Sequence, residues 1–224
     1  MIHTSTISIL WLTLGVASGA VIVVAPVSIS LGWLLARKRF FGRSVVETLV
    51  SLPLVLPATA IGYLLLALLG RDGWLGERTL GFDPGILFTW RAAVLASAVV
   101  ALPLSTRVAR AAFEGVDPRL ESMARSLGAS KARTFTTVTL PLARRGLAAA
   151  LALGFGRALG EFGATVIVAG NIPGRTQTLS LAIFEGIQLG DERRTLTLVG
   201  ITCVVAFVVL FTVERLLRTR ERAA

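Results

Sequence analysis

Apolar residues gather along this chain into five long runs separated by polar stretches. Leu, Ala and Val dominate the runs, and no alternation of apolar and polar residues indicates barrel strands. Each run reaches the roughly 20 residues with which a helix crosses about 30 Å of hydrocarbon. The pattern therefore predicts an all-α polytopic membrane protein with five transmembrane helices, at about residues 7–36, 45–69, 86–104, 146–169 and 196–217.

The basic residues predict the orientation of these helices. Of the 23 Lys and Arg residues, 16 follow the first span, lie between the third and fourth spans, or belong to the C-terminal tail. The positive-inside rule places these regions in the cytoplasm. The N-terminus is then outside and the C-terminus is cytoplasmic, as an odd number of spans requires. The 16 residues are Arg37, Lys38, Arg39, Arg43, Arg107, Arg110, Arg119, Arg125, Lys131, Arg133, Arg144, Arg145, Arg215, Arg218, Arg220 and Arg222.

Composition agrees with a membrane protein and argues against other classes. The chain is 54% hydrophobic and 16% charged, with a mean hydropathy of +0.76, which is too apolar for a soluble domain. The net charge is +10, but the basic residues lie where the membrane topology predicts them, so we expect no nucleic acid partner. The single cysteine, Cys203, lies in an apolar run and excludes an intrachain disulfide.

Residues that could carry catalysis are scarce. Lys38 follows Arg37 and Lys131 follows Ser130, so neither lysine belongs to a Gly-Lys-Ser/Thr phosphate-binding loop. The only histidine, His3, is close to the external terminus, which argues against a Ser–His protease pair and against a metal cluster in the membrane. We therefore expect no catalytic residue, no metal site and no cofactor in this chain, and any ATP must be bound by another polypeptide.

Prolines interrupt two of the apolar runs. Pro53 and Pro57 lie in the second run and Pro103 lies in the third. Each proline removes a backbone donor and predicts a bend. Ordinary kinked packing and a bent helix that lines a path are both compatible with this pattern.

The segment from Asp117 to Pro141 predicts two short helices outside the membrane. Asp117 is a suitable N-cap, and Pro118 suits the first helical position. Gly128 can adopt the left-handed conformation that ends the first helix, Ser130 can cap the second, and Pro141 is expected to stop it. In the first helix an apolar stripe recurs at positions i, i+3, i+4 and i+7, formed by Leu120, Met123, Ala124 and Leu127.

Such a stripe needs a partner, either a groove in another protein or the membrane surface, and periodicity alone leaves both open. The spacing Ala124-x-x-x-Gly128, nine residues, then Val138-Thr139-Leu140-Pro141 resembles the EAA loop of ABC importer permeases, which favours the protein groove. In one respect it departs from that family, because Ser122 occupies the usual glutamate position and Glu121 precedes it. The resemblance implies docking onto a separate ATPase through Leu120, Glu121, Met123, Ala124, Leu127, Gly128, Val138, Leu140 and Pro141.

The fourth run carries two ionisable residues, Arg157 and Glu161, whose spacing of four lets them pair on one helix face or flank a pathway. Small residues for close helix packing are Gly156, Gly160 and Gly163.

The sequences Gly160-Glu161-Phe162-Gly163-Ala164 and Asn171-Ile172-Pro173-Gly174 resemble the oxyanion branch of the importer permeases, and most of all the molybdate permeases. Expected path residues are Arg157, Glu161, Thr165, Asn171, Thr176, Thr178 and Ser180; for the hydroxyl and amide side chains, a cap or loop hydrogen bond is the alternative role.

The resemblance implies one transmembrane domain over residues 1–224, with the type I ABC importer fold and a cytoplasmic coupling loop at 105–145. It further implies a multi-pass permease of the bacterial inner membrane, working as a homodimer with two cytoplasmic ABC ATPase subunits that bind ATP and Mg, and with a periplasmic molybdate-binding protein. The expected function is ATP-driven import of molybdate or tungstate. The alternatives are a sulfate or thiosulfate permease and, more distantly, a secondary transporter that needs no ATPase.

Overall fold

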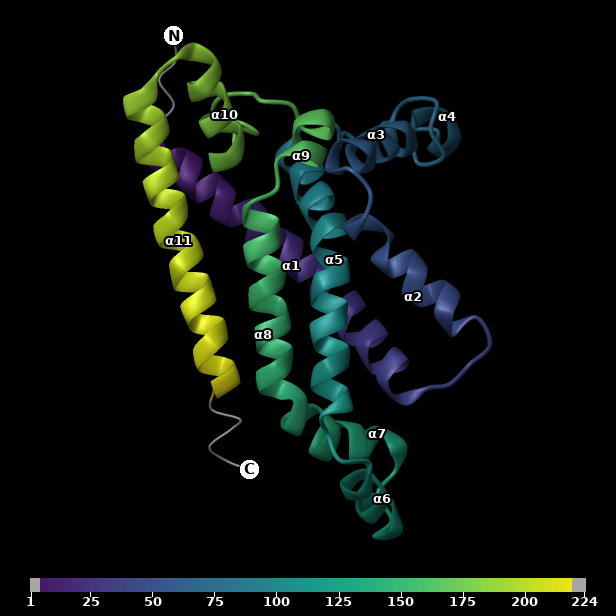
Figure 1. Ribbon diagram of the computed structural model, residues 1–224. Helices are drawn as coiled ribbons and strands as arrows, with labels where there is room; N and C mark the ends of the chain where they lie inside the picture. The colour runs from purple at the N-terminus through teal and green to yellow at the C-terminus, as the bar shows by residue number, and fades with distance from the viewer. Residues whose placement is uncertain (1–4, 219–224) are drawn as a thin grey trace.

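The computed structural model describes residues 5–218, so His3, Arg220 and Arg222 lie outside the described part of the chain. The regular structure between residues 5 and 218 is entirely helical (Figure 1). In chain order the elements are α1 (Thr6–Arg37), α2 (Arg43–Ser51), η1 (Leu52–Leu54), α3 (Ala58–Leu69), α4 (Glu77–Leu80), α5 (Trp90–Glu114), α6 (Pro118–Ser126), α7 (Lys131–Thr134), η2 (Phe135–Thr139), α8 (Leu140–Leu159), α9 (Gly163–Val168), α10 (Leu179–Leu189) and α11 (Glu192–Arg218).

The lengths of the helices confirm an all-α polytopic membrane protein. Four helical segments of the described chain are long and apolar enough to cross a membrane, namely Thr6–Arg37, Trp90–Glu114, Lys131–Leu159 and Glu192–Thr212. A fifth crossing exists if the bent pair formed by α2 with η1 and by α3 is one span. The number of spans is therefore four or five, in agreement with the predicted five.

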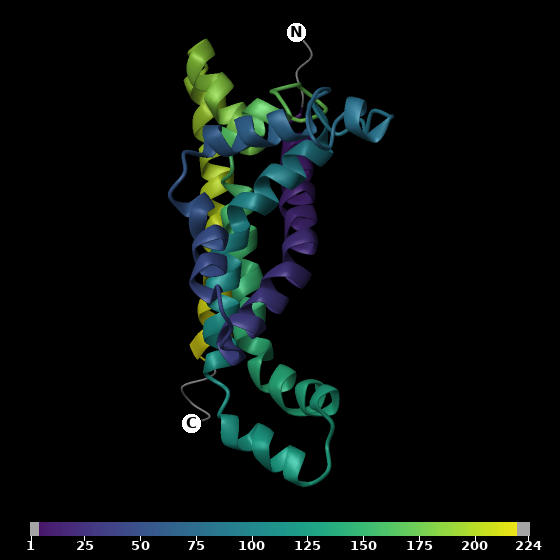
Figure 2. The ribbon, with the colours of Figure 1, turned by 90° about the vertical axis from the view of Figure 1, so that its right-hand side faces the viewer.

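The second run, expected at 45–69, is bent at its prolines, as Pro53 and Pro57 predict. The chain bends by 108° between η1 and α3, so that α3 lies across the end of the bundle (Figures 1 and 2). Pro53 lies in η1 and Pro57 directly precedes α3. Because neither proline has an N–H to donate, the helical hydrogen bonds cannot continue through residues 53–57.

The predicted bounds of two other spans are wrong. The fourth helix was expected at 146–169 but ends at Leu159, and α9 is a separate helix that starts at Gly163. The third was expected to end at residue 104 but runs to Glu114. Because α5 continues to Glu114 and α8 begins at Leu140, the loop expected at 105–145 is confined to residues 115–139. The 11-residue helix α10, absent from the sequence prediction, is apolar but too short to cross a bilayer.

Helix α5 is the centre of the bundle, with α1 and α8 packed against it and α11 on the outside (Figures 1 and 2). In the most apolar window of α5 67% of the residues are buried, whereas the corresponding figure for α11 is 6%. Alanines fill much of the core of α5, including Ala92, Ala93, Ala96 and Ala101. Small side chains let helices approach closely, which is a main source of helix association in lipid.

Helices α6 and α7 project from one end of the bundle (Figure 1). This end also holds the C-terminus of α1, and the sequence places most of the basic residues there; we call it the basic end. Helices α3, α9 and α10 lie at the opposite end (Figure 1). Helix α1 starts at the opposite end and α11 runs toward the basic end, so the chain crosses the bundle an odd number of times.

Candidate functional site

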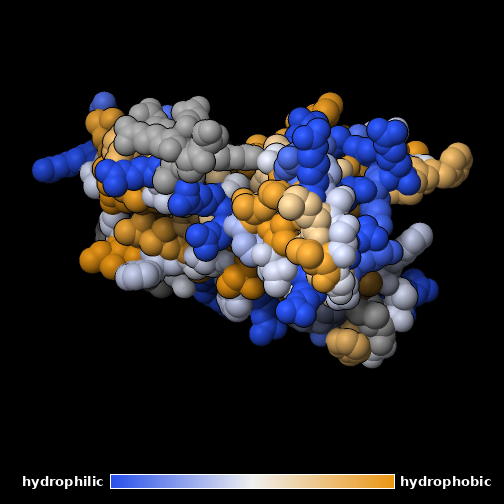
Figure 3. Space-filling view, turned by 90° about the horizontal axis from the view of Figure 1, so that it is seen from below, coloured by the Kyte–Doolittle hydropathy of each residue, from blue (hydrophilic) through white to orange (hydrophobic). Residues whose placement is uncertain are grey.

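Helix α6 begins as its sequence predicts. The Asp117 side chain accepts a hydrogen bond from the N–H of Arg119 at 2.8 Å, and Pro118 occupies the first turn. The apolar stripe of α6 faces outward: Leu120, Met123 and Leu127 are 43%, 62% and 87% exposed. Seen from the basic end, apolar side chains gather between hydrophilic ones (Figure 3). The described structure therefore leaves this stripe uncovered.

The turn after α6 also follows the prediction. Gly128 has φ of +87°, a left-handed conformation that disfavours residues with a Cβ. The Ser130 hydroxyl then accepts the N–H of Arg133 at 3.2 Å and caps α7. Gly128 thus sets the angle between the two short helices.

Pro141 does not stop the second helix, contrary to expectation. Helix α7 continues through the π-helical segment η2 into α8, and Pro141 lies in the first turn of α8. In η2 the N–H of Leu140 bonds to the carbonyl of Phe135. The wider π turn changes the hydrogen-bonding register just before the proline, which relieves the clash of its ring with the preceding turn.

Glu121 is half-buried, and its carboxylate is bonded to α1 and η2. Its carboxylate pairs with Arg37, the last residue of α1, at 3.0 Å and accepts the Thr139 hydroxyl at 2.7 Å. Arg37 also donates to the carbonyl of Val116 at 2.8 Å. These bonds join α6 to α1 and to η2. In the sequence Arg37 predicts only the orientation of the helices, and no local spacing indicates that it pairs with Glu121.

The remaining predicted docking residues divide between the surface and the interior. Leu140 packs on the cluster around Phe113 and Ala143, and Ala124 and Val138 are half-buried. Pro141 is exposed. Within the apolar stripe of α6, Leu120, Met123 and Leu127 are therefore the residues that the structure leaves available for a partner.

The break between α8 and α9 holds the predicted ion pair. Arg157 and Glu161 lie 2.9 Å apart, which confirms their pairing. The other oxygen of Glu161 accepts the N–H of Ala164 at 2.9 Å and thereby holds the start of α9. The Glu161 side chain is 1% exposed and that of Arg157 is 35% exposed. The carboxylate is therefore buried, while the Arg157 side chain is partly exposed.

The other predicted path residues lie in α9, in the loop that leads to α10, or in α10 itself. Thr176 has a structural role, because its hydroxyl accepts the N–H of Ile172 and donates to the carbonyl of Gly170, both at 3.0 Å. Within the described residues, the hydroxyls of Thr165 and Thr178 and the Oδ1 of Asn171 are buried without a hydrogen-bond partner. Ser180 is half-buried in α10.

The three predicted packing glycines do not form one helix face, because α8 ends before Gly160. Gly156 approaches Val209 of α11, whereas a Cβ on Gly163 would lie 2.8 Å from the Cβ of Ala58 in α3. Gly160 has only its own helical turn nearby. The close approach of α9 to α3 therefore depends on Gly163.

One hydrogen bond at the opposite end of the bundle was not predicted from the sequence. The buried Thr13 hydroxyl of α1 accepts the N–H of Leu179 at 2.8 Å and so positions the start of α10. A threonine in an apolar run is compatible with many roles, so its sequence carries no signal for this contact.

Fold and site together define a class of protein. The chain is a helical bundle with helices long enough to span a membrane. It has an exposed apolar stripe on α6, outside the bundle, and an ion pair at the break between α8 and α9. It belongs to the family described as "Binding-protein-dependent transport system inner membrane component", whose model matches residues 28–220. It is thus a multi-pass permease of the inner membrane in an ABC transporter, and its partners are ATPase subunits and a periplasmic binding protein.

Relatives of known description agree with this assignment. The chain is 44% identical over 220 residues to the molybdenum transport system permease protein ModB of Haemophilus influenzae, covering 96% of this chain and 95% of the relative. It is 45% identical over 215 residues to ModB of Escherichia coli K12, covering 95% and 94%. Identity to the sulfate transport system permease protein CysT of Escherichia coli K12 is 34% over 186 residues, covering 83% and 67%.

Solved structures share the fold. A chain of a bacterial ABC transporter involved in import of the acidic polysaccharide alginate superposes with a TM-score of 0.74 at 22% identity, covering 95% of this chain and 79% of that one. A chain of the inward-facing MetNI methionine ABC transporter gives a TM-score of 0.66 at 18% identity and covers 93% of both chains. At these identities the comparison supports the importer permease fold alone.

Proposed function

We propose that this chain is the pore subunit of an ATP-driven importer of molybdate, with tungstate as a related substrate. The observation that carries this proposal is its identity of 44–45% over nearly the whole length of two molybdenum permeases, compared with 34% to a sulfate permease. Two copies of the chain form the pore, each copy carries one ATPase subunit, and a periplasmic molybdate-binding protein delivers the ion. The whole chain acts as one transmembrane domain.

The basic end faces the cytoplasm in this proposal, and α6 docks into an apolar groove of the ATPase. Leu120, Met123 and Leu127 enter the groove, because their exposed apolar surface is then removed from water. The contacts of Glu121 transmit a pull on α6 to α1, and the continuous helix from Lys131 to Leu159 transmits it to α8. ATP and Mg act in the ATPase subunits, and the permease responds by alternating access.

For the translocation path we propose that Arg157 contacts the passing anion. The Arg157 side chain is partly exposed, whereas the carboxylate of Glu161 is buried and would repel a dianion if it were exposed. Glu161 thus acts as a positioning residue that orients Arg157 and holds α9. Thr165, Asn171 and Thr178 supply further polar atoms near the same path.

Uptake in a strain that lacks its own molybdate and sulfate permeases tests the substrate. We expect uptake of labelled molybdate that depends on the ATPase and the binding protein, with sulfate uptake much weaker. Sulfate uptake without molybdate uptake would favour the sulfate permease. Flux through the purified chain alone, driven by an ion gradient, would favour a secondary transporter.

The orientation has a separate test. Single cysteines placed on residues 117–141, in a chain whose Cys203 is replaced by Ala, should resist an impermeant thiol reagent in intact cells and react in inverted vesicles. Reaction in intact cells would contradict the docking of this segment on a cytoplasmic ATPase.

A further inference from the structure

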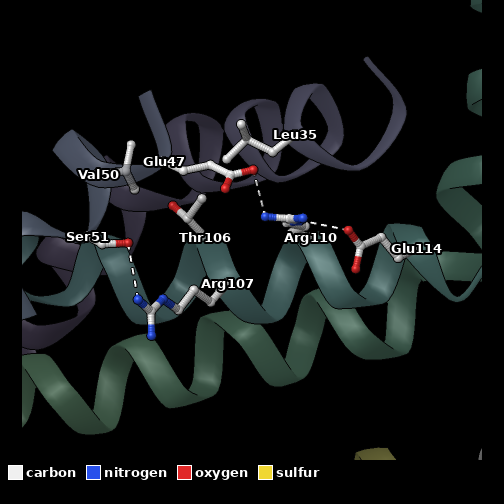
Figure 4. A pocket seen from close by; sticks show the side chains of 8 residues that line it. All are labelled: Leu35, Glu47, Val50, Ser51, Thr106, Arg107, Arg110 and Glu114. Atoms are coloured by element: carbon white, nitrogen blue, oxygen red, sulfur yellow. Dashed lines mark hydrogen bonds and ion pairs between the residues drawn. The ribbon is translucent and has the colours of Figure 1, made fainter. Parts of the chain in front are cut away.

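A pocket that includes charged and hydroxyl side chains lies in the basic half of the bundle, between the end of α1, α2 and α5 (Figure 4). Its volume is about 390 Å³, which is within the usual range for small-ligand sites. The polar lining consists of Glu47, Ser51, Thr106, Arg107, Arg110 and Glu114. We call it the Arg107 pocket. It is separate from the exposed stripe of α6 and from the ion pair at the break after α8.

The carboxylates of the Arg107 pocket are already neutralised. Arg110 lies 2.9 Å from Glu47 and 2.7 Å from Glu114, and Glu47 also pairs with Arg43 at 2.9 Å. The charges of Arg43 and Arg110 therefore balance those of Glu47 and Glu114. They also hold α2 against α5, so the wall of the pocket is fixed.

Arg107 carries the charge that remains. Its guanidinium donates a hydrogen bond to the Ser51 hydroxyl at 3.2 Å, and no carboxylate of the described residues lies within ion-pair distance of it. Next to it, Thr106 is 2% exposed, and its hydroxyl has no hydrogen-bond partner in the described structure. The hydroxyl points into the space between α2 and α5 (Figure 4).

These donors suit an anion rich in oxygen. The Arg107 guanidinium offers several N–H groups in a plane, which match the oxygens of a tetrahedral oxyanion. Ser51 accepts from Arg107, so its own proton is free to be donated, and the buried Thr106 hydroxyl gains the partner that it lacks. A cation would meet an uncompensated positive charge here, and an apolar ligand would leave these donors unsatisfied.

We propose that the Arg107 pocket binds a tetrahedral oxyanion through Arg107, Ser51 and Thr106. This inference rests on the proposed function: the pocket is a site on the cytoplasmic side of the pore, where the transported oxyanion is held before release. The phosphate of an anionic lipid presents the same chemistry at this depth, so the experiment separates the two sources.

Protection of a nearby cysteine from labelling tests the site. Val50 lines the pocket, so the reporter is Val50→Cys in a chain that also carries Cys203→Ala. The complex with its ATPase is placed in discs of phosphatidylcholine or of phosphatidylglycerol, and labelling of the permease band by the uncharged reagent N-ethylmaleimide is timed. The probes are molybdate and sulfate, added without the binding protein.

We expect molybdate or sulfate to slow labelling in phosphatidylcholine discs. In Arg107→Gln the half-protecting concentration should rise roughly ten-fold or more, because a hydrogen bond to a charged group is lost. Arg107→Lys should show a smaller rise because it keeps the charge. Arg144→Gln, a change at an exposed arginine outside the pocket, should leave protection unchanged. Co-purification of the ATPase reports that each variant is folded.

Each outcome decides the proposal. If phosphatidylglycerol alone slows labelling and Arg107→Gln abolishes this effect, the site stands with lipid phosphate as its occupant. If neither ions at millimolar concentration nor phosphatidylglycerol slow labelling, or if Arg107→Gln is protected like the parent, the site is refuted. Normal molybdate uptake with an unprotected reporter would refute only the site. Protection by sulfate in a chain that takes up no molybdate would refute only the molybdate assignment.

Discussion

Glu121 of α6 forms an ion pair of 3.0 Å with Arg37, the last residue of α1, although the two residues are far apart in the sequence. The Thr139 hydroxyl donates to the same carboxylate at 2.7 Å. The short helix with the exposed stripe is therefore bound to two parts of the bundle. A force on α6 has a direct route into α1.

The first prediction concerns this connection. Glu121→Gln should lower the free energy of unfolding of the solubilised complex by about 2 kcal/mol, because bonds to a charged group at low exposure are lost. The ATPase should still co-purify, but fewer ions should be imported per ATP hydrolysed. Thermal unfolding and parallel uptake and ATPase assays in proteoliposomes measure both effects.

Glu77→Gln is the matched control, because the Arg71–Glu77 pair is 81% and 47% exposed at the opposite end. It should change stability by less than about 1 kcal/mol. An unchanged ratio of transport to hydrolysis in Glu121→Gln would show that force does not pass through this pair.

The second prediction concerns docking of the stripe. Leu127 is 87% exposed, so Leu127→Glu should leave the permease folded. In the complex the new charge would enter an apolar groove, and ATPase binding should weaken roughly ten-fold or more. The measurement is a titration of the ATPase onto permease in detergent. Leu75→Glu makes the same change at the opposite end and should bind like the parent; equal binding by Leu127→Glu would contradict the groove.

The third prediction concerns the contact of α5 with α8. A Cβ on Gly154 would collide with the Oγ of Ser105, which is buried and has no hydrogen-bond partner in the described structure. Gly154→Ala should therefore destabilise the protein by about 1–2 kcal/mol. Ser105→Ala alone should be nearly neutral, and the double variant should recover most of the loss.

A double-mutant cycle from thermal unfolding gives the interaction energy of this pair. Additive losses would show that Gly154→Ala acts through a contact other than Ser105.

The fourth prediction concerns the ion pair at the break. Arg157→Ala leaves the buried Glu161 carboxylate unpaired and should cost about 3 kcal/mol or more. Adding Glu161→Gln removes that charge and should restore part of the stability. Uptake should remain low in both variants, because the cation proposed to meet the anion is missing. Normal uptake by the double variant would remove Arg157 from the path.

Features set by local spacing were predictable from the sequence. The helix start at Asp117, the turn at Gly128 and the pairing of Arg157 with Glu161 each depend on neighbours within a few residues. The long apolar helices were predictable for the same reason, since lipid leaves the backbone few alternatives to a helix.

Features that depend on distant contacts were not predictable. Pro57 predicts a bend but not its angle of 108°. Hydropathy does not predict the end of α8 at Leu159, because the residues on both sides are equally apolar. Pro141 suggested a helix end, yet the π segment before it accommodates the ring. The pairing of Glu121 with Arg37 requires a folded bundle to bring them together.

Helix α8 runs without a break over 20 residues, from Leu140 to Leu159. At 1.5 Å per residue it is about 30 Å long, and a tilt of about 5° at the basic end would displace its far tip by roughly 2.6 Å. That displacement is about the length of one hydrogen bond. A tilt that is too small to disrupt side-chain packing at the basic end of α8 is therefore enough to exchange hydrogen bonds where α8 meets α9.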